Sequence, residues 1–156
     1  MKKLIALAML TTLMSGGLAL ANEGHTGDHE VAFGEPGDAS KPARLIMITA
    51  REIDGGMKFL PDNIKIRVGE QVRFRIRNAG ELEHEMVFAT LEQNLEHAVE
   101  MAKNPDMEHD DPNAVRLQPG DVTDIVWRFT NAGNFDFSCL IPGHREGGMF
   151  GTIVVQ

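Results

Sequence analysis

The 156-residue sequence contains a single cysteine, Cys139, so no disulfide can form within the chain. Exported proteins usually pair their cysteines, and a lone thiol in an oxidising compartment is a hazard unless it is buried or bound to a metal. Phosphate-binding glycine motifs, a hydrolase-type nucleophile turn and internal repeats are also absent. Cys139 is therefore the residue whose role most needs an explanation.

Basic residues are few, since 15 Lys and Arg stand against 23 Asp and Glu. The sequence has no arginine-rich run or basic stripe, which argues against nucleic acid as a partner. An acidic surface instead suits cations or basic proteins, although it also serves solubility alone.

The N-terminus has the layout of a secretory signal peptide. Lys2 and Lys3 precede an apolar run that ends in the small-x-small cleavage site Ala19-Leu20-Ala21. We therefore predict that residues 1–21 are removed after Ala21, that the protein is exported to the periplasm, and that the mature chain is not stably inserted in the membrane. Loss of two lysines and no acidic residue moves the formal net charge from −8 to −10.

Residues 22–42 are rich in Gly, Asp, Glu and Pro and predict a flexible acidic leader. His25 and His29 lie four residues apart in it. They could capture a metal transiently, or they could simply be solvated. Residues 43–156 remain as one domain, of a length that supports a single hydrophobic core.

This domain is predicted to be all-β, because apolar residues alternate with polar ones in most of its segments. The short turn at residues 68–71 suggests that the strands before and after it form a hairpin. Several short strands separated by turn signals indicate a Greek-key β-sandwich. The predicted strands are 43–53, 63–68, 71–78, 83–89, 121–129, 134–139 and 149–155.

One segment, residues 91–104, has helical instead of strand periodicity. We predict one short helix inserted among the strands, followed by a loop that leads to residue 121. The apolar residues at helical spacing are Leu91, Leu95, Ala98, Val99 and Ala102.

The loop that contains the lone cysteine also contains His144 and Met149, each five residues beyond the previous one. A thiolate, an imidazole and a weak thioether become a type 1 copper ligand set when a second histidine completes the trigonal two-His, one-Cys plane. Zinc is the main competitor for Cys and His, but structural zinc sites prefer four strong donors and rarely use methionine. The sequence therefore favours one copper centre that cycles between Cu+ and Cu2+.

His84 is the best candidate for the second histidine. It stands at the start of a predicted strand and is in phase with Met86 and Phe88, so its side chain should point into the sandwich. The other histidines lie in acidic or helical surroundings: His25, His29, His97 and His109.

One pattern near the C-terminus is formed by Gly133, Phe135, Phe137, Cys139, Pro142, Gly143, His144, Gly148, Met149 and Gly151. It resembles the signature of the cupredoxins, the blue-copper protein family. The resemblance implies copper bound by His84, Cys139 and His144, with Met149 as the axial ligand. Many small members place asparagine after the first histidine, where it ties the two ligand loops together, but here the residue is Glu85.

The inserted helix, the leader and the extra methionines resemble the periplasmic copper-tolerance cupredoxins of the CopI kind. His97 and Met101 share a helix face, and Met107 and His109 follow in the loop. These four residues could form a second copper site that prefers Cu+, since thioethers are soft ligands. Alternatively, Met101 packs into the core and the histidines are solvated.

Two functions remain open from the sequence. A monomeric electron carrier would exchange electrons with a redox partner protein through His144, with Leu140, Ile141 and Pro142 as an apolar docking patch. A copper-homeostasis protein would sequester Cu+, or oxidise it in an enzymatic reaction, with the help of the accessory Met and His residues. Multicopper oxidases need at least two such domains and a binuclear copper centre needs two cysteines, so both are disfavoured.

Overall fold

The computed structural model describes residues 32–105, 107 and 111–156. The predicted signal peptide, the leader up to residue 31 with its two histidines, and His109 lie outside the described residues.

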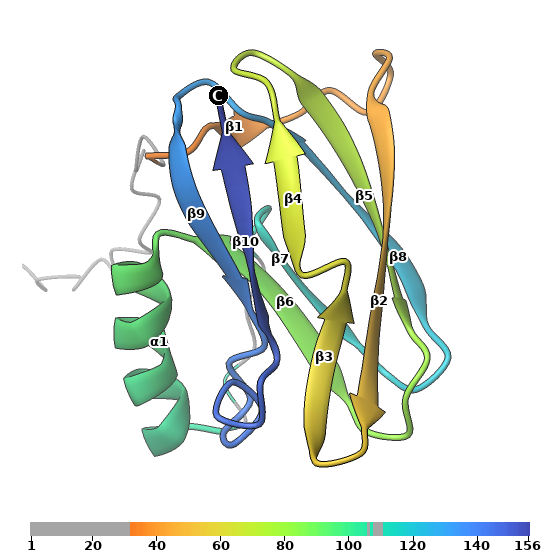
Figure 1. The fold of residues 1–156 in the computed structure, drawn as a ribbon, viewed down its shortest axis with the longest axis vertical. Coiled ribbons are helices and arrows are strands. Elements are labelled where there is room, and N and C mark those ends of the chain that lie inside the picture. The colour runs from red at the N-terminus through yellow and green to blue at the C-terminus, as the bar shows by residue number, and fades with distance from the viewer. Residues whose placement is uncertain (1–31, 106, 108–110) are drawn as a thin grey trace, which may run out of the picture.

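Two five-stranded sheets pack face to face, which confirms the predicted β-sandwich with one inserted helix (Figure 1). The first sheet has the order β1-β8-β5-β2-β3 and the second β4-β10-β9-β6-β7. The strands are β1 (Glu35–Pro36), β2 (Arg44–Ile53), β3 (Gly56–Leu60), β4 (Asn63–Ile66), β5 (Gln71–Asn78), β6 (His84–Ala89), β7 (Ala114–Leu117), β8 (Val122–Arg128), β9 (Gly133–Ser138) and β10 (Phe150–Val155).

Apolar side chains, which alternate with polar ones along the strands, form the core between the two sheets. In β5, Val72, Phe74 and Ile76 are buried, while the arginines between them face outward. Phe74 packs against Phe88 of the other sheet with ring centroids 4.7 Å apart, and Trp127 of β8 is fully buried. Burial of these aromatic rings is the main stabilising contribution to a sandwich of this kind.

The predicted hairpin between residues 63–68 and 71–78 is wrong, although the tight turn at Gly69 is present with φ +81°. β4 pairs in parallel with β10 in the second sheet, whereas β5 pairs with β2 and β8 in the first. The turn therefore carries the chain from one sheet to the other. Periodicity identifies each strand, but it says nothing about which strand is its neighbour.

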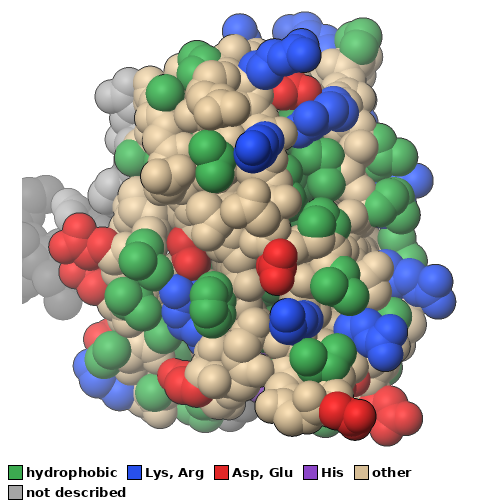
Figure 2. All heavy atoms as spheres, viewed as in Figure 1, with side chains coloured by type: hydrophobic (Ala, Val, Ile, Leu, Met, Phe, Trp, Pro, Cys, Tyr) green, Lys and Arg blue, Asp and Glu red, His purple; other side chains and the backbone are tan. Residues whose placement is uncertain are grey.

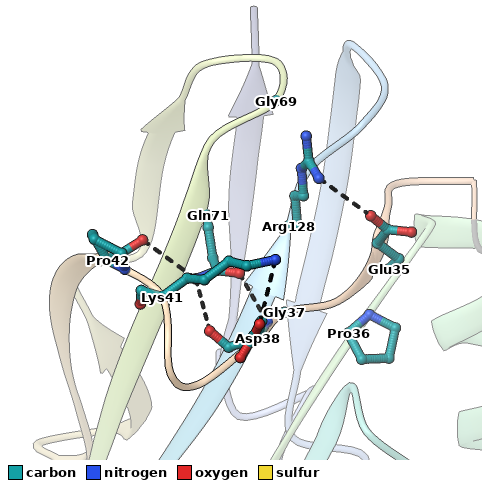
Figure 3. Close-up of a pocket in the computed structure, with 9 residues that line it drawn as sticks. All are labelled: Glu35, Pro36, Gly37, Asp38, Lys41, Pro42, Gly69, Gln71 and Arg128. Carbon is teal, nitrogen blue, oxygen red and sulfur yellow. Dashed lines mark hydrogen bonds and ion pairs between the residues drawn. The ribbon is translucent and has the colours of Figure 1, made fainter.

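The domain begins before residue 43, because the last part of the predicted leader packs against the first sheet. Phe33 is fully buried and stacks on Trp127, and β1 pairs with β8. Gln71 donates to the carbonyl oxygens of Asp38 and Pro42, which closes one side of a polar hollow of about 630 Å³ between this segment and the sheet (Figure 3).

The inserted helix, α1 (Leu91–Lys103), begins with a capping box in which Thr90 and Gln93 exchange hydrogen bonds. It packs on β6 and β9 (Figure 1). The face toward the sheet carries Asn94 and Met101, both fully buried, and Ala98 is the one member of the predicted apolar stripe that packs partly buried against it. Leu91, Leu95 and Val99 are 48–55% exposed because the adjacent face of the helix packs on the sheet, where Met101 is buried and Asn94 donates hydrogen bonds to Val87 and Asp136.

Charged and apolar side chains are interspersed over the face that includes β4, β9 and β10 (Figure 2). Within the described residues, the helix is too short and too polar to cross a membrane.

Asp124 of β8 joins two arginines of the neighbouring strand on the outer face of the first sheet. Its carboxylate accepts from Arg75 at 2.8 and 2.9 Å and from Arg73 at 3.2 Å. The hydrogen bond from Arg75 lowers the pKa of Asp124 below its ordinary value of 3.8. The stabilisation is therefore complete well above the ordinary pKa of 3.8 and is lost as the pH falls through the lowered pKa.

We expect Asp124→Asn to lower the free energy of unfolding at pH 7 by about 1 kcal/mol, because two arginines lose their anionic acceptor. Urea unfolding at pH 7 and pH 3 measures this difference, which should shrink at the lower pH. Asp62→Asn is the control, since Asp62 is exposed and lies 4.0 Å from Lys58. An equal loss in both variants would contradict the role of the arginine pair.

Candidate metal centre

Four potential ligands come together at one end of the sandwich. His84 is the first residue of β6, Cys139 follows the last residue of β9, and His144 and Met149 lie in the loop from β9 to β10. Antiparallel pairing of β6 with β9 sets Val87 opposite Ser138, so the start of β6 lies beside the end of β9. This pairing brings His84 to Cys139 across 55 residues of sequence.

The donor atoms of His84, Cys139 and His144 all lie within 4.8 Å of one another. The Nδ1 atoms of His84 and His144 are 3.3 Å apart, and Cys139 Sγ is 3.3 Å from His144 Nδ1. Such separations suit donors that share one metal ion through bonds of about 2.0–2.3 Å. Met149 is fully buried in the same core cluster as Cys139, so a thioether is available beside the three strong donors.

Backbone hydrogen bonds fix the loop that carries three of these residues. Met149 N–H donates to the carbonyl of His144 at 3.0 Å, and Cys139 N–H donates to the carbonyl of Met149 at 3.1 Å. Gly148 has φ +98°, a conformation that favours glycine. The hairpin of β2 and β3 supports the loop from the other sheet, because Met57 N–H donates to the carbonyl of Gly147 at 2.9 Å.

Burial sets the protonation of the three strong donors. It raises the pKa of the Cys139 thiol to about 12. It lowers the pKa of His84, although Glu52 opposes this, and it lowers the pKa of His144, to which His84 adds. Both imidazoles are thus neutral at pH 7 with a lone pair for a metal, while the thiol must release its proton when a metal binds.

A carboxylate from the other sheet holds the first histidine. Glu52 of β2 accepts a hydrogen bond from His84 Nε2 at 2.9 Å, and it also accepts from the N–H groups of Glu81 and Leu82. Burial alone would raise the pKa of Glu52, but these N–H groups and the nearby His84 bring it to about 2. Glu52 is therefore ionised, and His84 keeps its proton on Nε2 and leaves Nδ1 free for a metal.

The sequence left open how the two ligand segments are tied together, and the structure shows that Glu85 links them. Its backbone N–H donates to Cys139 Sγ at 3.4 Å, and its carboxylate accepts from Leu140 N–H at 2.8 Å. Glu85 is buried, so these contacts form away from bulk water. A glutamate thus ties β6 to the cysteine segment, as asparagine does in the family that the sequence resembles.

A third carboxylate attaches the ligand loop to the helix. Buried Asp136 of β9 forms a two-point ion pair with Arg145 at 2.9 and 3.1 Å. It also accepts from Ser138 Oγ at 2.5 Å and from Asn94 of α1 at 2.6 Å. The loop residue next to His144 is therefore locked to both β9 and α1.

The residues predicted to form a second copper site differ in how deeply they are buried. Met101 is fully buried and Met107 partly buried, and both belong to a small apolar cluster with Val87 and Leu140. His97 lies half-buried on α1, and His109 is outside the described residues. Leu140 is buried in this cluster and cannot form part of the predicted docking patch, which leaves Ile141 half-buried and Pro142 exposed beside His144.

Sequence reasoning missed Glu52, Asp136 and Asn94. Glu52 did carry a signal, because it continues the inward alternation of Ile48 and Ala50 and places a charge where an apolar residue is expected. Asp136 carried none, since the face of β9 on which it lies is buried only because α1 covers it.

Residues 47–156 match the family of copper binding proteins described as plastocyanin/azurin. The chain is 46% identical over 132 residues to the copper-resistant cuproprotein CopI of Rubrivivax gelatinosus, a match that covers 85% of this chain and 78% of that protein. It is 32% identical to the protein of the same name from Pseudomonas aeruginosa, covering 82% and 84% of the two chains.

Among solved structures, the dithionite-reduced auracyanin from Roseiflexus castenholzii matches with a TM-score of 0.61 and 20% identity. The match covers 74% of this chain and 99% of auracyanin. At this identity the likeness establishes the fold alone.

Cys139→Ala should abolish the intense visible absorption of the oxidised, copper-loaded protein, because that absorption needs a thiolate bound to the metal. His97→Ala is the control and should leave it intact, since His97 lies on α1 and outside the set of three donors. Absorption spectra of both variants after copper loading make the comparison. Retained absorption in the Cys139→Ala protein would contradict the assignment of the ligands.

Glu85→Ala should destabilise the metal-free protein by about 1–3 kcal/mol, because it leaves the buried N–H of Leu140 without its acceptor. Glu85→Gln keeps an oxygen at this position and should lose less. Urea unfolding of the two variants and the parent separates the effects. A loss from Glu85→Gln as large as that from Glu85→Ala would show that the hydrogen bond to Leu140 is not the main contribution.

Proposed function

Because the chain belongs to the plastocyanin/azurin family of copper-binding proteins, we propose that it is a one-electron redox protein of the periplasm with a role in copper tolerance. Its type 1 copper site is formed by His84, Cys139, His144 and Met149. When bound, copper supplies a one-electron couple, Cu2+/Cu+. The proposed location is supported by the signal-peptide layout of residues 1–21.

The observation that carries the redox function is the rigid, buried placement of the donors. His84 and Cys139 are fully buried, and His144 is 9% exposed. Both sheets hold them: Glu52 holds His84, Met57 holds the loop, and Asp136 holds Arg145 next to His144. A site whose ligands are locked by surrounding hydrogen bonds changes little when the metal changes charge, which favours fast electron exchange.

The surface around His144 suits brief contact with a redox partner protein. Pro142 and Phe150 are exposed there, and Ile141 is half-buried. Glu146 is an exposed acidic residue two positions beyond His144. A small apolar surface with a charged residue at its rim is typical of weak, transient complexes.

The copper-tolerance role is supported by the relatives, since two proteins that cover more than four-fifths of this chain are named as copper-resistant. One structural observation favours a further step, in which the protein handles Cu+ as cargo. Met101 and Met107 pack in the cluster that includes Leu140, the residue after Cys139. Thioethers at this position could bind Cu+ close to the type 1 site, and a bound Cu+ could pass one electron to it.

Copper stoichiometry separates the electron carrier from the copper-handling protein. We expect the mature protein to reach its maximal visible absorption at one Cu2+, and then to bind at least one further Cu+ tightly. Total bound metal and visible absorption are measured together through the titration. Saturation at one copper in both oxidation states would contradict the copper-handling role and leave the electron carrier.

The matched control is the double variant Met101→Leu, Met107→Leu, which keeps apolar volume and removes both thioethers. It should retain the visible absorption and lose the additional Cu+. An unchanged Cu+ stoichiometry would place the second metal elsewhere in the chain.

A further inference from the structure

Glu52 is a charged residue in an otherwise apolar row. The inward-facing side chains of β2 that precede it are Ile48 and Ala50, both fully buried, and β2 belongs to the sheet that supplies no copper ligand. At the end of this row, the Glu52 carboxylate lies against the segment that leads into β6. The first sheet thus contacts the copper site through this anionic side chain as well as through the backbone of Met57.

The Glu52 carboxylate reaches across to the segment that ends in His84 and contacts three of its residues. Oε1 accepts from His84 Nε2 at 2.9 Å and from Leu82 N–H at 3.0 Å, while Oε2 accepts from Glu81 N–H at 2.9 Å. Gly80 leaves room for this approach, because a Cβ at that position would clash with both carboxylate oxygens. The segment from Gly80 to His84 therefore packs closely around the Glu52 carboxylate.

These contacts determine which nitrogen of His84 can bind copper. A carboxylate only accepts hydrogen bonds, so the proton of the neutral imidazole lies on Nε2. Nδ1 then carries the lone pair, and it is the atom that lies 3.3 Å from Nδ1 of His144. The ring is also held against rotation, since Glu52 is itself anchored by two backbone N–H groups.

The two histidine ligands differ in the hydrogen-bond partners of their rings. Among the residues that the structure describes, the imidazole ring of His144 forms hydrogen bonds only with His84 and Cys139, and no carboxylate lies within bonding distance of the ring. The direct hydrogen bond of Glu52 therefore reaches the copper through one ligand, His84. An anionic partner raises the basicity of an imidazole ligand and favours the more highly charged state of the metal.

We propose that Glu52 is a positioning residue that fixes His84 as an Nδ1 ligand and lowers the reduction potential of the copper by stabilising Cu2+ over Cu+. The inference deepens the one-electron function proposed above and rests on it. Glu52 lies 32 residues before His84 in the sequence and on the opposite sheet, so only the tertiary structure connects the two.

Glu52→Gln is the most direct test, because it keeps the size of the side chain and removes its charge. We expect Cu2+ to bind about tenfold more weakly with little change for Cu+. For a one-electron couple, a tenfold change in one state alone raises the potential by about 59 mV. Spectroelectrochemical titration measures the potential, and the electron paramagnetic resonance spectrum reports any change at the copper.

Glu81→Gln is the matched control. It removes one negative charge from the same segment, but the Glu81 side chain is exposed and its backbone N–H still donates to Glu52. Equal potentials for Glu52→Gln and Glu81→Gln would overturn the proposal, since the effect would then come from general charge. Glu52→Asp keeps the charge and should restore much of the parent potential.

The metal-free protein gives a second, independent test. Two-bond ¹H–¹⁵N spectra identify the nitrogen of His84 that carries the proton, which should be Nε2 in the parent and in Glu52→Asp. Glu52→Ala should yield a mixture of tautomers, and a pure Nε2–H form in that variant would overturn the positioning role. Because this measurement needs no copper, its result is distinct from a failure of the redox function, which would appear as a parent protein without a one-electron wave.

Discussion

The register between β6 and β9 is the constraint on which the rest of the site depends. His84 and Cys139 come from different strands, and only the antiparallel pairing of Val87 with Ser138 places them within reach of one metal. Because side chains alternate along a strand, a slip of one residue would turn His84 away from the sandwich interior. Phe88 and Phe137, which face each other in this pairing, pack with Phe74 and Phe59 of the opposite sheet and so make the register part of the core.

Three buried or half-buried carboxylates surround the ligands, and each has partners that compensate its charge. Glu52 accepts from two backbone N–H groups and an imidazole, Glu85 accepts from Leu140, and Asp136 pairs with Arg145. Unpaired charges at these positions would be strongly destabilising, whereas paired ones hold a geometry that apolar contacts would leave loose. The acidic composition of the chain thus serves the site as well as the surface.

The inserted helix is joined to the copper site through its buried face. Asn94 reaches Asp136, and Met101 packs on Leu140 beside the cysteine ligand. The stripe of Leu91, Leu95 and Val99 remains on the surface. Periodicity in a sequence identifies a helix but not the face that it buries, and here the buried face combines two hydrogen bonds donated by Asn94 with the packing of Met101.

The sequence by itself determined the fold class and the donors, because alternation is a local property and the spacing of Cys139, His144 and Met149 lies within one loop. It also singled out His84 from its phase in the strand. Only the tertiary structure decided that β4 and β5 lie in different sheets, that residues from 32 onward join the domain, and that Glu52 and Asp136 lie at the copper site. These features depend on pairing between segments far apart in the chain, for which one sequence contains no periodic signal.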